Sequence, residues 1–405
     1  MGKKRYLLYI DRYLGKLARF FMPLAEAPLT RPPQSLGVIR LWAIGESLLA
    51  LPAIQALKTQ WPGAKITVVT TPRAVDVFRG QAFIDEVVVL RPNLHLRSVH
   101  WVFQHRKKFD IAIDFEPYFY VSAFLARMIG KYSLGFDTLT RGKLYTKAVP
   151  YQDDQHVVKT NFDLVRAVEV EEEVPMNLIA VAGDPTTPRL RGAPRAGTKA
   201  GLPAEALAKA GPATHLTIAL APGGGVDFRR WPVERFAQVA DYLVGKHGCE
   251  IVLVGDEADE PILRDVQKKM KNSARIVSDL SLPEVAELLS QCRLTIANDG
   301  GLMHVSAAMV APTLGLFGPE TPVRLGPYGP KNQALYHQLE DNPIINVSRG
   351  EVPGMLRISG DPSRYVRAIT VEEVLATADK MLRTEEETMS ETISKTSLIE
   401  MARIS

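Results

Sequence analysis

Short apolar runs alternate with amphipathic stretches along most of this chain, in two separate series. In the first series, runs rich in β-branched and other apolar residues occupy positions 36–41, 65–70, 86–90 and 110–115. Such runs predict buried strands, and a helical pattern over 46–60 ends at Pro62 and Gly63. Strands that alternate with helices predict a parallel sheet covered on both faces. We therefore expect an α/β domain over residues 35–182.

The second series repeats this plan. Its predicted strands occupy 215–220, 250–254, 275–277, 294–297 and 313–317. Its predicted helices occupy 233–246, 261–270 and 283–291, and a further helix begins near Met303. We expect a second α/β domain over 214–384. The stretch between the domains, 183–213, is rich in Pro, Gly, Ala and Lys, which is typical of a linker or insertion, with a short helix expected over 203–210.

The two ends of the chain differ from the domains. Within residues 1–34, apolar residues recur at helical spacing beside basic ones: Leu7, Ile10, Leu14, Leu17 and Phe21 with Arg5, Arg12, Lys16 and Arg19. Two interpretations of this basic amphipathic extension stay open. Residues 1–31 form a helix that lies on an anionic membrane surface, or one that packs on the second domain or on a partner subunit. The polar tail, 385–405, is expected to be disordered.

Composition narrows the function classes. The chain has 405 residues, of which 46% are hydrophobic and 23% charged, as in a soluble globular protein of two domains. A net charge of +4 is small for this length, and no nucleic-acid motif is present. Cys249 and Cys292 flank predicted strands and are typical of reduced, buried thiols. We therefore expect a cytoplasmic protein without a structural metal site and without nucleic-acid partners.

The most informative segment is Asn298-Asp299-Gly300-Gly301-Leu302-Met303-His304, which joins a predicted strand to a predicted helix. Two glycines at the start of a helix leave its free N–H groups open to a phosphate, which the helix dipole also favours. Asp299 and His304 can then face whatever that phosphate carries. The alternative is an ordinary strand–helix turn with a buried histidine.

This segment, together with the stretches 311–313, 317–319 and 324–329, resembles the donor-site block of glycosyltransferase family 9, the ADP-heptose:lipopolysaccharide heptosyltransferases. The family usually shows Asp-Ser/Thr-Gly followed two residues later by His, and here Gly300 replaces the hydroxyl residue. The resemblance implies the GT-B fold, in which two Rossmann-like domains with parallel sheets face each other across a cleft that holds the active site.

A glycine loop and an arginine pair form the second match. Ala221-Pro222-Gly223-Gly224-Gly225 ends a predicted strand, and Phe228-Arg229-Arg230-Trp231-Pro232 opens the next helix. Glycines let the backbone approach phosphate oxygens, and arginines add fixed positive charge. The segment resembles the family's stretch with a lysine two residues before Trp-Pro, a position that Arg229 holds here. A simple tight turn is the alternative interpretation of the glycines.

The third match lies after the first strand. Residues 40–52 resemble the family's first motif, in which the aspartate of a Leu-Gly-Asp triplet is taken to activate the acceptor hydroxyl. Here the triplet is Ile44-Gly45-Glu46. A glutamate can act as a general base, although its extra methylene moves the carboxylate by about one bond length. The alternative is that Glu46 is only an acidic residue in the first turn of a helix.

Two further residues are candidates for the nucleoside pocket. By resemblance, Glu257 would accept hydrogen bonds from the ribose, and Leu280 would line the adenine pocket. The alternatives are a solvated acid in the first turn of a helix and an ordinary core residue.

The resemblance implies an inverting, metal-independent transfer of heptose, or a related sugar, from an ADP-linked donor to a lipopolysaccharide core or other envelope glycan. Glu46 would accept the hydroxyl proton, with Asp299 and His304 at the donor, while Arg229 and the helix start at Gly301 would stabilise the leaving diphosphate. The nucleotide sugar is a substrate, and no cofactor is implied. A cytoplasmic location at the inner-membrane surface is expected. Two alternatives stay open: a nucleotide-sugar epimerase of GT-B fold, and a non-catalytic nucleotide-sugar-binding relative.

Overall fold

The computed structural model describes residues 32–91, 96–170, 216–339 and 360–384. The predictions for the N-terminal extension, for the helix at 203–210 and for the tail at 385–405 lie outside these residues. Within the described ranges, no helix is long and apolar enough to cross a membrane.

The first half of the chain forms a six-stranded parallel sheet in the order β3-β2-β1-β4-β5-β6. Its central strand, β1, pairs with β2 on one side and β4 on the other, so that Val38 lies between Val68 and Ile113. All three side chains are fully buried. The strands are β1 Ser35–Ile39, β2 Lys65–Thr70, β3 Glu86–Val89, β4 Phe109–Asp114, β5 Gly130–Asp137 and β6 Lys147–Pro150.

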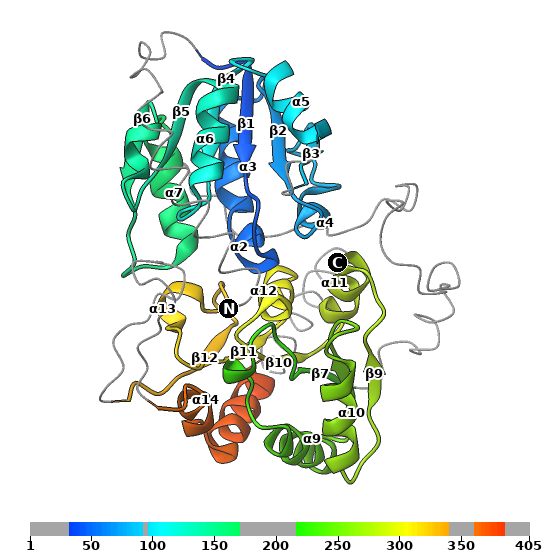
Figure 1. Ribbon diagram of the computed structural model, residues 1–405. Helices are drawn as coiled ribbons and strands as arrows, with labels where there is room; N and C mark the ends of the chain where they lie inside the picture. Colours follow the sequence, from blue (N-terminus) through cyan, green and yellow to red (C-terminus); the bar gives the residue numbers. More distant parts are fainter. Residues whose placement is uncertain (1–31, 92–95, 171–215, 340–359, 385–405) are drawn as a thin grey trace, which may run out of the picture.

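Helices cover both faces of this sheet (Figure 1). One face packs against α3 (Leu51–Gln60) and α7 (Val157–Arg166), which contact each other. The other face packs against α6 (Tyr120–Ile129), which contacts α5 (Leu96–Gln104). The remaining short helices are α2 Ile44–Leu48, α4 Val75–Phe78 and η1 Arg141–Leu144.

The helix predicted over 46–60 is two helices, α2 and α3, and this prediction of one element was wrong. Pro52 lies in the first turn of α3. Proline has no N–H to donate to the carbonyl of Leu48, and its ring clashes with that carbonyl in a continuous helix. The chain therefore ends α2 at Leu48 and begins a new helix at Leu51.

The second half forms another six-stranded parallel sheet, in the order β12-β11-β10-β7-β8-β9. Its strands are β7 Thr217–Ala221, β8 Glu250–Val254, β9 Arg275–Val277, β10 Leu294–Asn298, β11 Thr313–Leu316 and β12 Gln333–Leu335. Its helices are η2 Asp227–Arg229, α9 Val233–His247, α10 Glu260–Lys269, α11 Leu282–Ser290, α12 Gly301–Ala308, α13 Pro322–Leu325 and α14 Arg364–Ala368.

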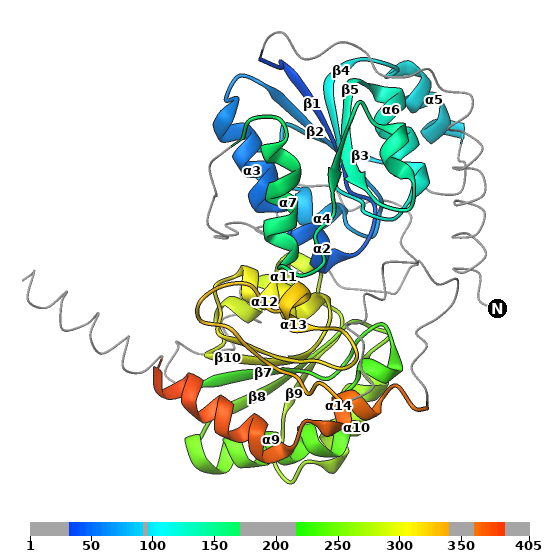
Figure 2. The same cartoon turned by 90° about the vertical axis from the view of Figure 1, so that its left-hand side faces the viewer.

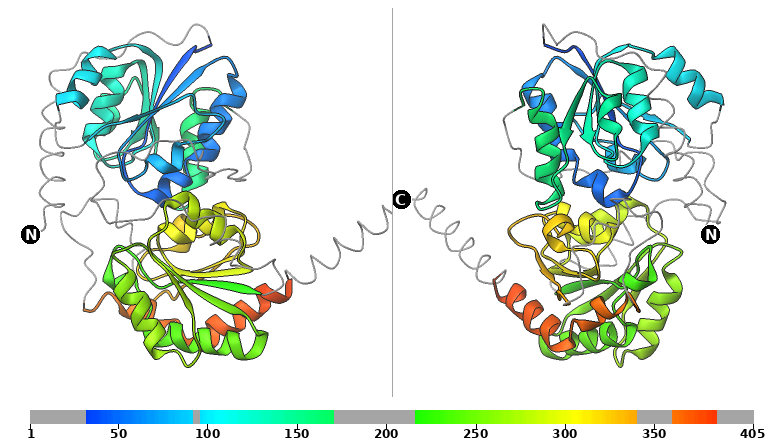
Figure 3. Two further views of the ribbon diagram at one scale, coloured as in Figure 1. Left: turned by 90° about the vertical axis from the view of Figure 1, so that its right-hand side faces the viewer. Right: turned by 60° about the vertical axis from the view of Figure 1, so that its left-hand side comes forward.

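Residues 371–384 form a last helix that runs beside α9 on the far side of the second sheet (Figures 2 and 3). Asp379 anchors it, because its carboxylate accepts hydrogen bonds from Tyr242 and Lys246 and pairs with His247, all on α9. Val374, Ala378 and Leu382 complete the apolar core between the two helices.

The two halves touch through connections that follow strand ends. Helix α2 contacts α12, which lies with α13 between the second sheet and the first half (Figure 2). The Arg324 side chain donates to Tyr151 Oη at 2.9 Å, and His156 Nε2 lies 3.0 Å from the carbonyl oxygen of Gly326. Loops from both sheets therefore meet at this junction, where ligands of open α/β sheets bind.

Candidate active site

The glycine loop after β7 packs tightly on Asp259, at the start of α10. A Cβ atom at Gly223 would lie 2.2 Å from the carboxyl carbon of Asp259, so a side chain there would displace the Asp259 carboxylate. Gly224 has a φ of 147°, a conformation that favours glycine, and its N–H donates to Asp259 Oδ1 at 3.2 Å. Both glycines therefore serve the conformation and packing of this loop, in addition to any contact with phosphate.

Two side chains fix the carbonyl groups of the same loop. Asn298, the last residue of β10, donates to the Pro222 carbonyl at 2.8 Å and accepts from the Trp231 N–H at 3.0 Å. The Arg230 guanidinium donates twice to the Gly224 carbonyl, at 2.6 and 2.9 Å, and pairs with Asp227 at 2.8 Å. Arg230 thus holds the loop in place, and its predicted contact with the donor stays a prediction.

Arg229 points the other way and joins two carboxylates. Its guanidinium lies 2.9 Å from Asp299 Oδ2 and 3.3 Å from Glu320 Oε2. Both carboxylates are almost fully buried, whereas the Arg229 side chain is 19% exposed. Burial raises the pKa of Asp299, and the nearby Arg229 charge opposes this shift. The structure therefore brings together the predicted residues Arg229 and Asp299, and leaves a minor part of the cation exposed.

The charged contacts continue toward the first half of the chain. Glu320 Oε1 pairs with Arg324 at 3.2 Å, and the buried Arg324 reaches Tyr151 and lies 3.9 Å from Asp153. Charges thus alternate from Asp299 through Arg229, Glu320 and Arg324 across the junction. The sequence stretch 324–329 carried part of the family resemblance, but the local pattern assigned no role to Glu320 or Arg324.

The start of α12 has Gly300 at the position where the family usually has a serine or threonine. Gly300 has an extended backbone, with φ of −177°, and a Cβ atom added there would lie 3.7 Å from its nearest neighbour, the carbonyl oxygen of Asn298. The Cβ atom of a serine or threonine would therefore fit at this position. Gly301 is the first residue of the helix, and its Cβ position lies 3.7 Å from Ile44 of α2.

His304 lies at the junction and packs against Gly45. A Cβ atom at Gly45 would be 2.4 Å from His304 Cδ2, so only glycine lets α2 and α12 approach this closely. The His304 ring is buried, and among the described residues its Nδ1 has no hydrogen-bond partner. Burial lowers the pKa of His304 to about 4, so the ring is neutral at pH 7.

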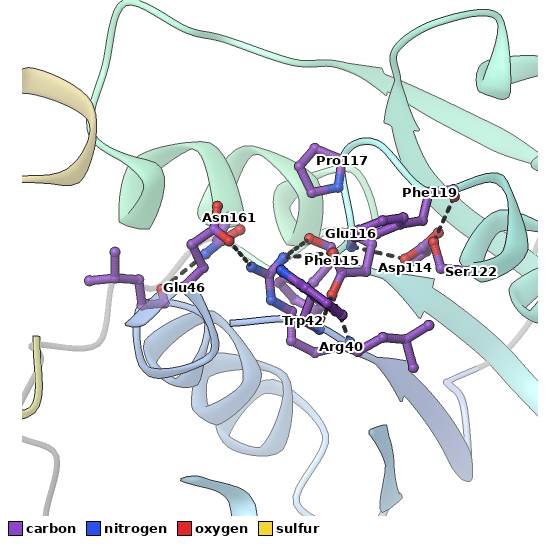
Figure 4. Close-up of polar contacts among 12 residues, drawn as sticks. Arg40, Trp42, Glu46, Asp114, Phe115, Glu116, Pro117, Phe119, Ser122 and Asn161 are labelled. Carbon is purple, nitrogen blue, oxygen red and sulfur yellow. Dashed lines mark hydrogen bonds and ion pairs between the residues drawn. The ribbon is translucent and has the colours of Figure 1, made fainter. Parts of the chain in front are cut away.

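Arg40 lies between two carboxylates at the end of β1 (Figure 4). Its guanidinium pairs with Glu46 Oε2 at 3.1 Å and with Glu116 Oε2 at 3.6 Å, and it donates to the Phe115 carbonyl at 2.6 Å. Arg40 and Glu116 are buried, while the Glu46 side chain is 18% exposed. The predicted base is therefore the solvent-facing end of a buried charged cluster, and Arg40 fixes its orientation.

Glu116 also holds the loop that leads into α2, the helix of Glu46. Its Oε1 accepts the backbone N–H groups of Leu41 and Trp42, at 2.6 and 2.7 Å. The next residue, Ala43, has a φ of 63°, which is strained for a residue with a side chain. Burial raises the pKa of Glu116 to about 7, Arg40 opposes this, and Glu46 adds to it. Sequence reasoning missed Glu116, although its place after a buried strand was a usable signal.

The nucleoside-pocket candidates lie on two further connections. Glu257 follows β8 and is exposed. Leu280 precedes α11 and is partly buried against the apolar core. Both assignments stay predictions. In the described parts of the chain, no three His, Cys, Asp or Glu side chains are grouped so that they could hold a metal ion.

The pKa values of His156 and His304 predict how stability depends on pH. Burial lowers both to about 4, against about 6.5 in an unfolded chain, so each ring takes up a proton on unfolding at intermediate pH. Their contribution to stability is present above pH 6.5 and is lost as the pH falls through 4. Glu116, with its raised pKa, acts in the opposite direction between pH 4.5 and 7.

A variant isolates one of these histidines. In His156→Gln, the free energy of unfolding, measured by urea denaturation from pH 4.5 to 6.5, should depend less steeply on pH than in the wild type. The expected difference approaches about 1.4 kcal/mol per pH unit near the middle of this range, the value for one proton. Equal slopes for the two proteins would contradict the lowered pKa of His156.

The chain has two α/β domains, each with a six-stranded parallel sheet, and the strand-end loops of the two sheets meet at one junction. This is the GT-B fold, as expected from the sequence. The family model for glycosyltransferase family 9 (heptosyltransferase) matches residues 104–349, and the chain belongs to this family.

The chain is similar in sequence to heptosyltransferases of several bacteria. The chain is 29% identical over 131 residues to lipooligosaccharide heptosyltransferase 2 of Haemophilus influenzae, a match that covers 31% of this chain and only 37% of that protein. It is 26% identical over 309 residues to lipopolysaccharide heptosyltransferase 1 of Pseudomonas aeruginosa, covering 72% of this chain and 81% of that protein.

Solved structures share the fold. A glycosyl transferase family 9 protein from Veillonella parvula has a TM-score of 0.69 at 22% identity, covering 89% of this chain and 100% of that one. The E. coli ADP-heptose lps heptosyltransferase II has a TM-score of 0.62 at 18% identity, covering 87% and 99%.

Proposed function

We propose that this protein transfers heptose, or a related sugar, from an ADP-linked donor to a lipopolysaccharide core or other envelope glycan. Family membership supports glycosyl transfer, and the heptosyltransferase relatives support the sugar and the acceptor. One observation carries the proposal most directly. The close packing of Gly45 on His304 places the loop of Glu46 beside the helix that begins at Gly301.

In the proposed reaction, Glu46 takes the proton from an acceptor hydroxyl as that oxygen attacks the anomeric carbon of the donor. A new carbon–oxygen bond forms while the bond from that carbon to the diphosphate breaks, which inverts the configuration. The ADP leaves with additional negative charge. Arg229 and the free N–H groups at the start of α12 are the groups that stabilise this charge.

Asp299 and Glu320 set the position of Arg229 in this scheme. Their two buried carboxylates hold the guanidinium at 2.9 and 3.3 Å, so it is preorganised before the donor binds. Preorganised charge costs no rearrangement at the moment of reaction. Among the remaining predicted donor contacts, we propose Glu257 for the ribose, Leu280 for the adenine and Gly223 to Gly225 for the phosphates.

The test is ADP release from ADP-heptose, with and without heptose-deficient lipopolysaccharide. Acceptor-dependent release of ADP, unchanged by EDTA, is expected. A sugar product formed without acceptor would instead identify an epimerase. Donor binding without turnover would identify a non-catalytic relative. Turnover only with a UDP- or GDP-linked sugar would overturn the ADP assignment.

We also propose that the protein works in the cytoplasm and touches the inner-membrane surface through residues 1–31. The basic and apolar residues of that segment support this proposal. Deleting residues 1–31 should abolish co-sedimentation with vesicles that contain anionic lipid, while ADP release with a soluble acceptor is retained. Full vesicle binding by the shortened protein would refute the membrane contact.

A further inference from the structure

Three strand-end loops of the first sheet bring a cation and two aromatic rings together at the same edge as the proposed base. Trp42 follows β1, Arg73 follows β2 and Phe119 follows β4, and these three strands are neighbours in the sheet. The Arg73 guanidinium carbon lies 5.2 Å from the centroid of the Trp42 ring. The Phe119 ring lies 6.1 Å from Trp42. The order along this edge is therefore cation, indole, phenyl.

This cluster is open to solvent. The Trp42 side chain is 40% exposed, which makes it one of the large hydrophobic residues at the surface, and Arg73 is also exposed. A tryptophan normally buries most of its ring, because its large apolar surface contributes strongly to stability. An exposed ring under a guanidinium at the carboxyl edge of a sheet is typical of a binding surface rather than of the core.

The loop that carries the ring is held rigidly. Glu116 accepts the backbone N–H groups of Leu41 and Trp42, and the same Glu116 pairs with Arg40, which in turn pairs with Glu46. Figure 4 shows Trp42, Glu116 and Glu46 around Arg40. The backbone of Trp42 and the carboxylate of the proposed base are thus attached to one buried cluster, which fixes the position of this loop relative to Glu46.

We propose that Trp42, Arg73 and Phe119 form an acceptor subsite for a sugar that carries an anionic group. The C–H face of a sugar ring is apolar and packs well on an exposed indole surface. The Arg73 guanidinium, with its forked donors, recognises a carboxylate or a phosphate on that sugar. Glu46 then faces a hydroxyl of the same or the adjoining residue. This inference rests on the proposed function and specifies its acceptor.

Binding and turnover are measured separately to test the subsite. With heptose-deficient lipopolysaccharide as the probe, acceptor KM should rise on the order of tenfold in Arg73→Gln and in Trp42→Ala. The value of kcat and the KM for ADP-heptose should change little. Arg73→Lys should recover part of the loss, because it keeps the charge. Trp42→Phe, which keeps an aromatic ring, should fall between the wild type and Trp42→Ala.

Fluorescence gives a readout that does not depend on catalysis. The acceptor should quench the tryptophan emission of the wild type and not that of Trp42→Phe, although the other three tryptophans remain. Phe103→Ala and Arg106→Gln are matched controls, because both residues are exposed on the same domain. Both control variants should retain wild-type KM and quenching.

Two modified acceptors distinguish the anionic groups. If Arg73 binds a phosphate, dephosphorylated acceptor should have the same raised KM with wild type and Arg73→Gln. If it binds a carboxylate, chemical reduction of the acceptor carboxyl groups should have that effect instead. An Arg73→Gln KM equal to that of the wild type with the untreated acceptor, in an enzyme that turns over, would overturn the subsite. Absence of turnover in the wild type together with unquenched Trp42 fluorescence would overturn the proposed function and this subsite with it.

Discussion

Glu46→Gln is expected to lower acceptor-dependent ADP release by about a thousandfold, since a positioned general base contributes about 10²- to 10⁴-fold. Glutamine has the shape of glutamate and keeps an oxygen that can accept from Arg40, so the buried cluster around Arg40 and Glu116 should remain folded. It cannot take a proton at neutral pH. The loss should therefore appear in kcat, while the affinity for ADP, measured by calorimetry, stays at the wild-type value.

A matched control is Glu86→Gln, which changes an exposed carboxylate on β3 that pairs with Lys65. This variant should keep full activity. Glu46→Asp should retain a measurable part of the activity, because the carboxylate is present but shorter by one methylene. Wild-type kcat in Glu46→Gln would assign the base to another residue.

Arg229→Met is expected to lower both stability and turnover. Removing the guanidinium leaves the buried carboxylates of Asp299 and Glu320 with one fewer partner each. Breaking a buried ion pair costs about 3–5 kcal/mol, and we expect about 3 kcal/mol here because Arg229 is itself partly exposed. Turnover should fall by about a hundredfold or more, since the departing diphosphate loses its cation. Urea denaturation and ADP release measure the two effects.

Two further variants separate the effects. Arg229→Lys restores a positive charge and should recover most of the stability and part of the turnover, because an ammonium lacks the guanidinium fork that reaches both carboxylates. Arg229→Met combined with Asp299→Asn removes one unpaired charge, so it should regain stability without regaining turnover. If Arg229→Met is as stable as the wild type, the ion pairs of Arg229 with Asp299 and Glu320 do not stabilise the fold, which would contradict the prediction.

The local pattern of the sequence was sufficient for much of the architecture. The predicted strands at 65–70, 250–254 and 275–277 have the same bounds as β2, β8 and β9. After a charged first residue, each strand is a run of apolar or β-branched residues, so its place in the sheet is visible in the sequence. The segment from Asn298 to His304 likewise indicated a strand end and helix start, because glycine and strand–helix spacing are local signals.

Other strands had no such signal. Strand β5, Gly130–Asp137, contains two glycines and a serine. Strands β6 and β12 are short edge strands, in which β6 has exposed positions and β12 is only partly buried. Their pairing depends on a neighbour that is already in place, as with β5 beside β4 and β12 beside β11. Pro52 divides the stretch 46–60 into α2 and α3. This signal was local, but the helical spacing of apolar residues continues across it and indicated a single helix.

The sequence by itself determined the family, the α/β class and the strand-end connections that carry Glu46, Arg229, Asp299 and His304. The tertiary structure alone decided what those side chains contact. Arg229 reaches Glu320, 91 residues away, and Gly45 receives His304 from the other half of the chain. Local sequence records whether a position is buried and how the backbone turns. Which charges meet is set by the packing of one sheet's loops on the other's, and that requires the complete fold.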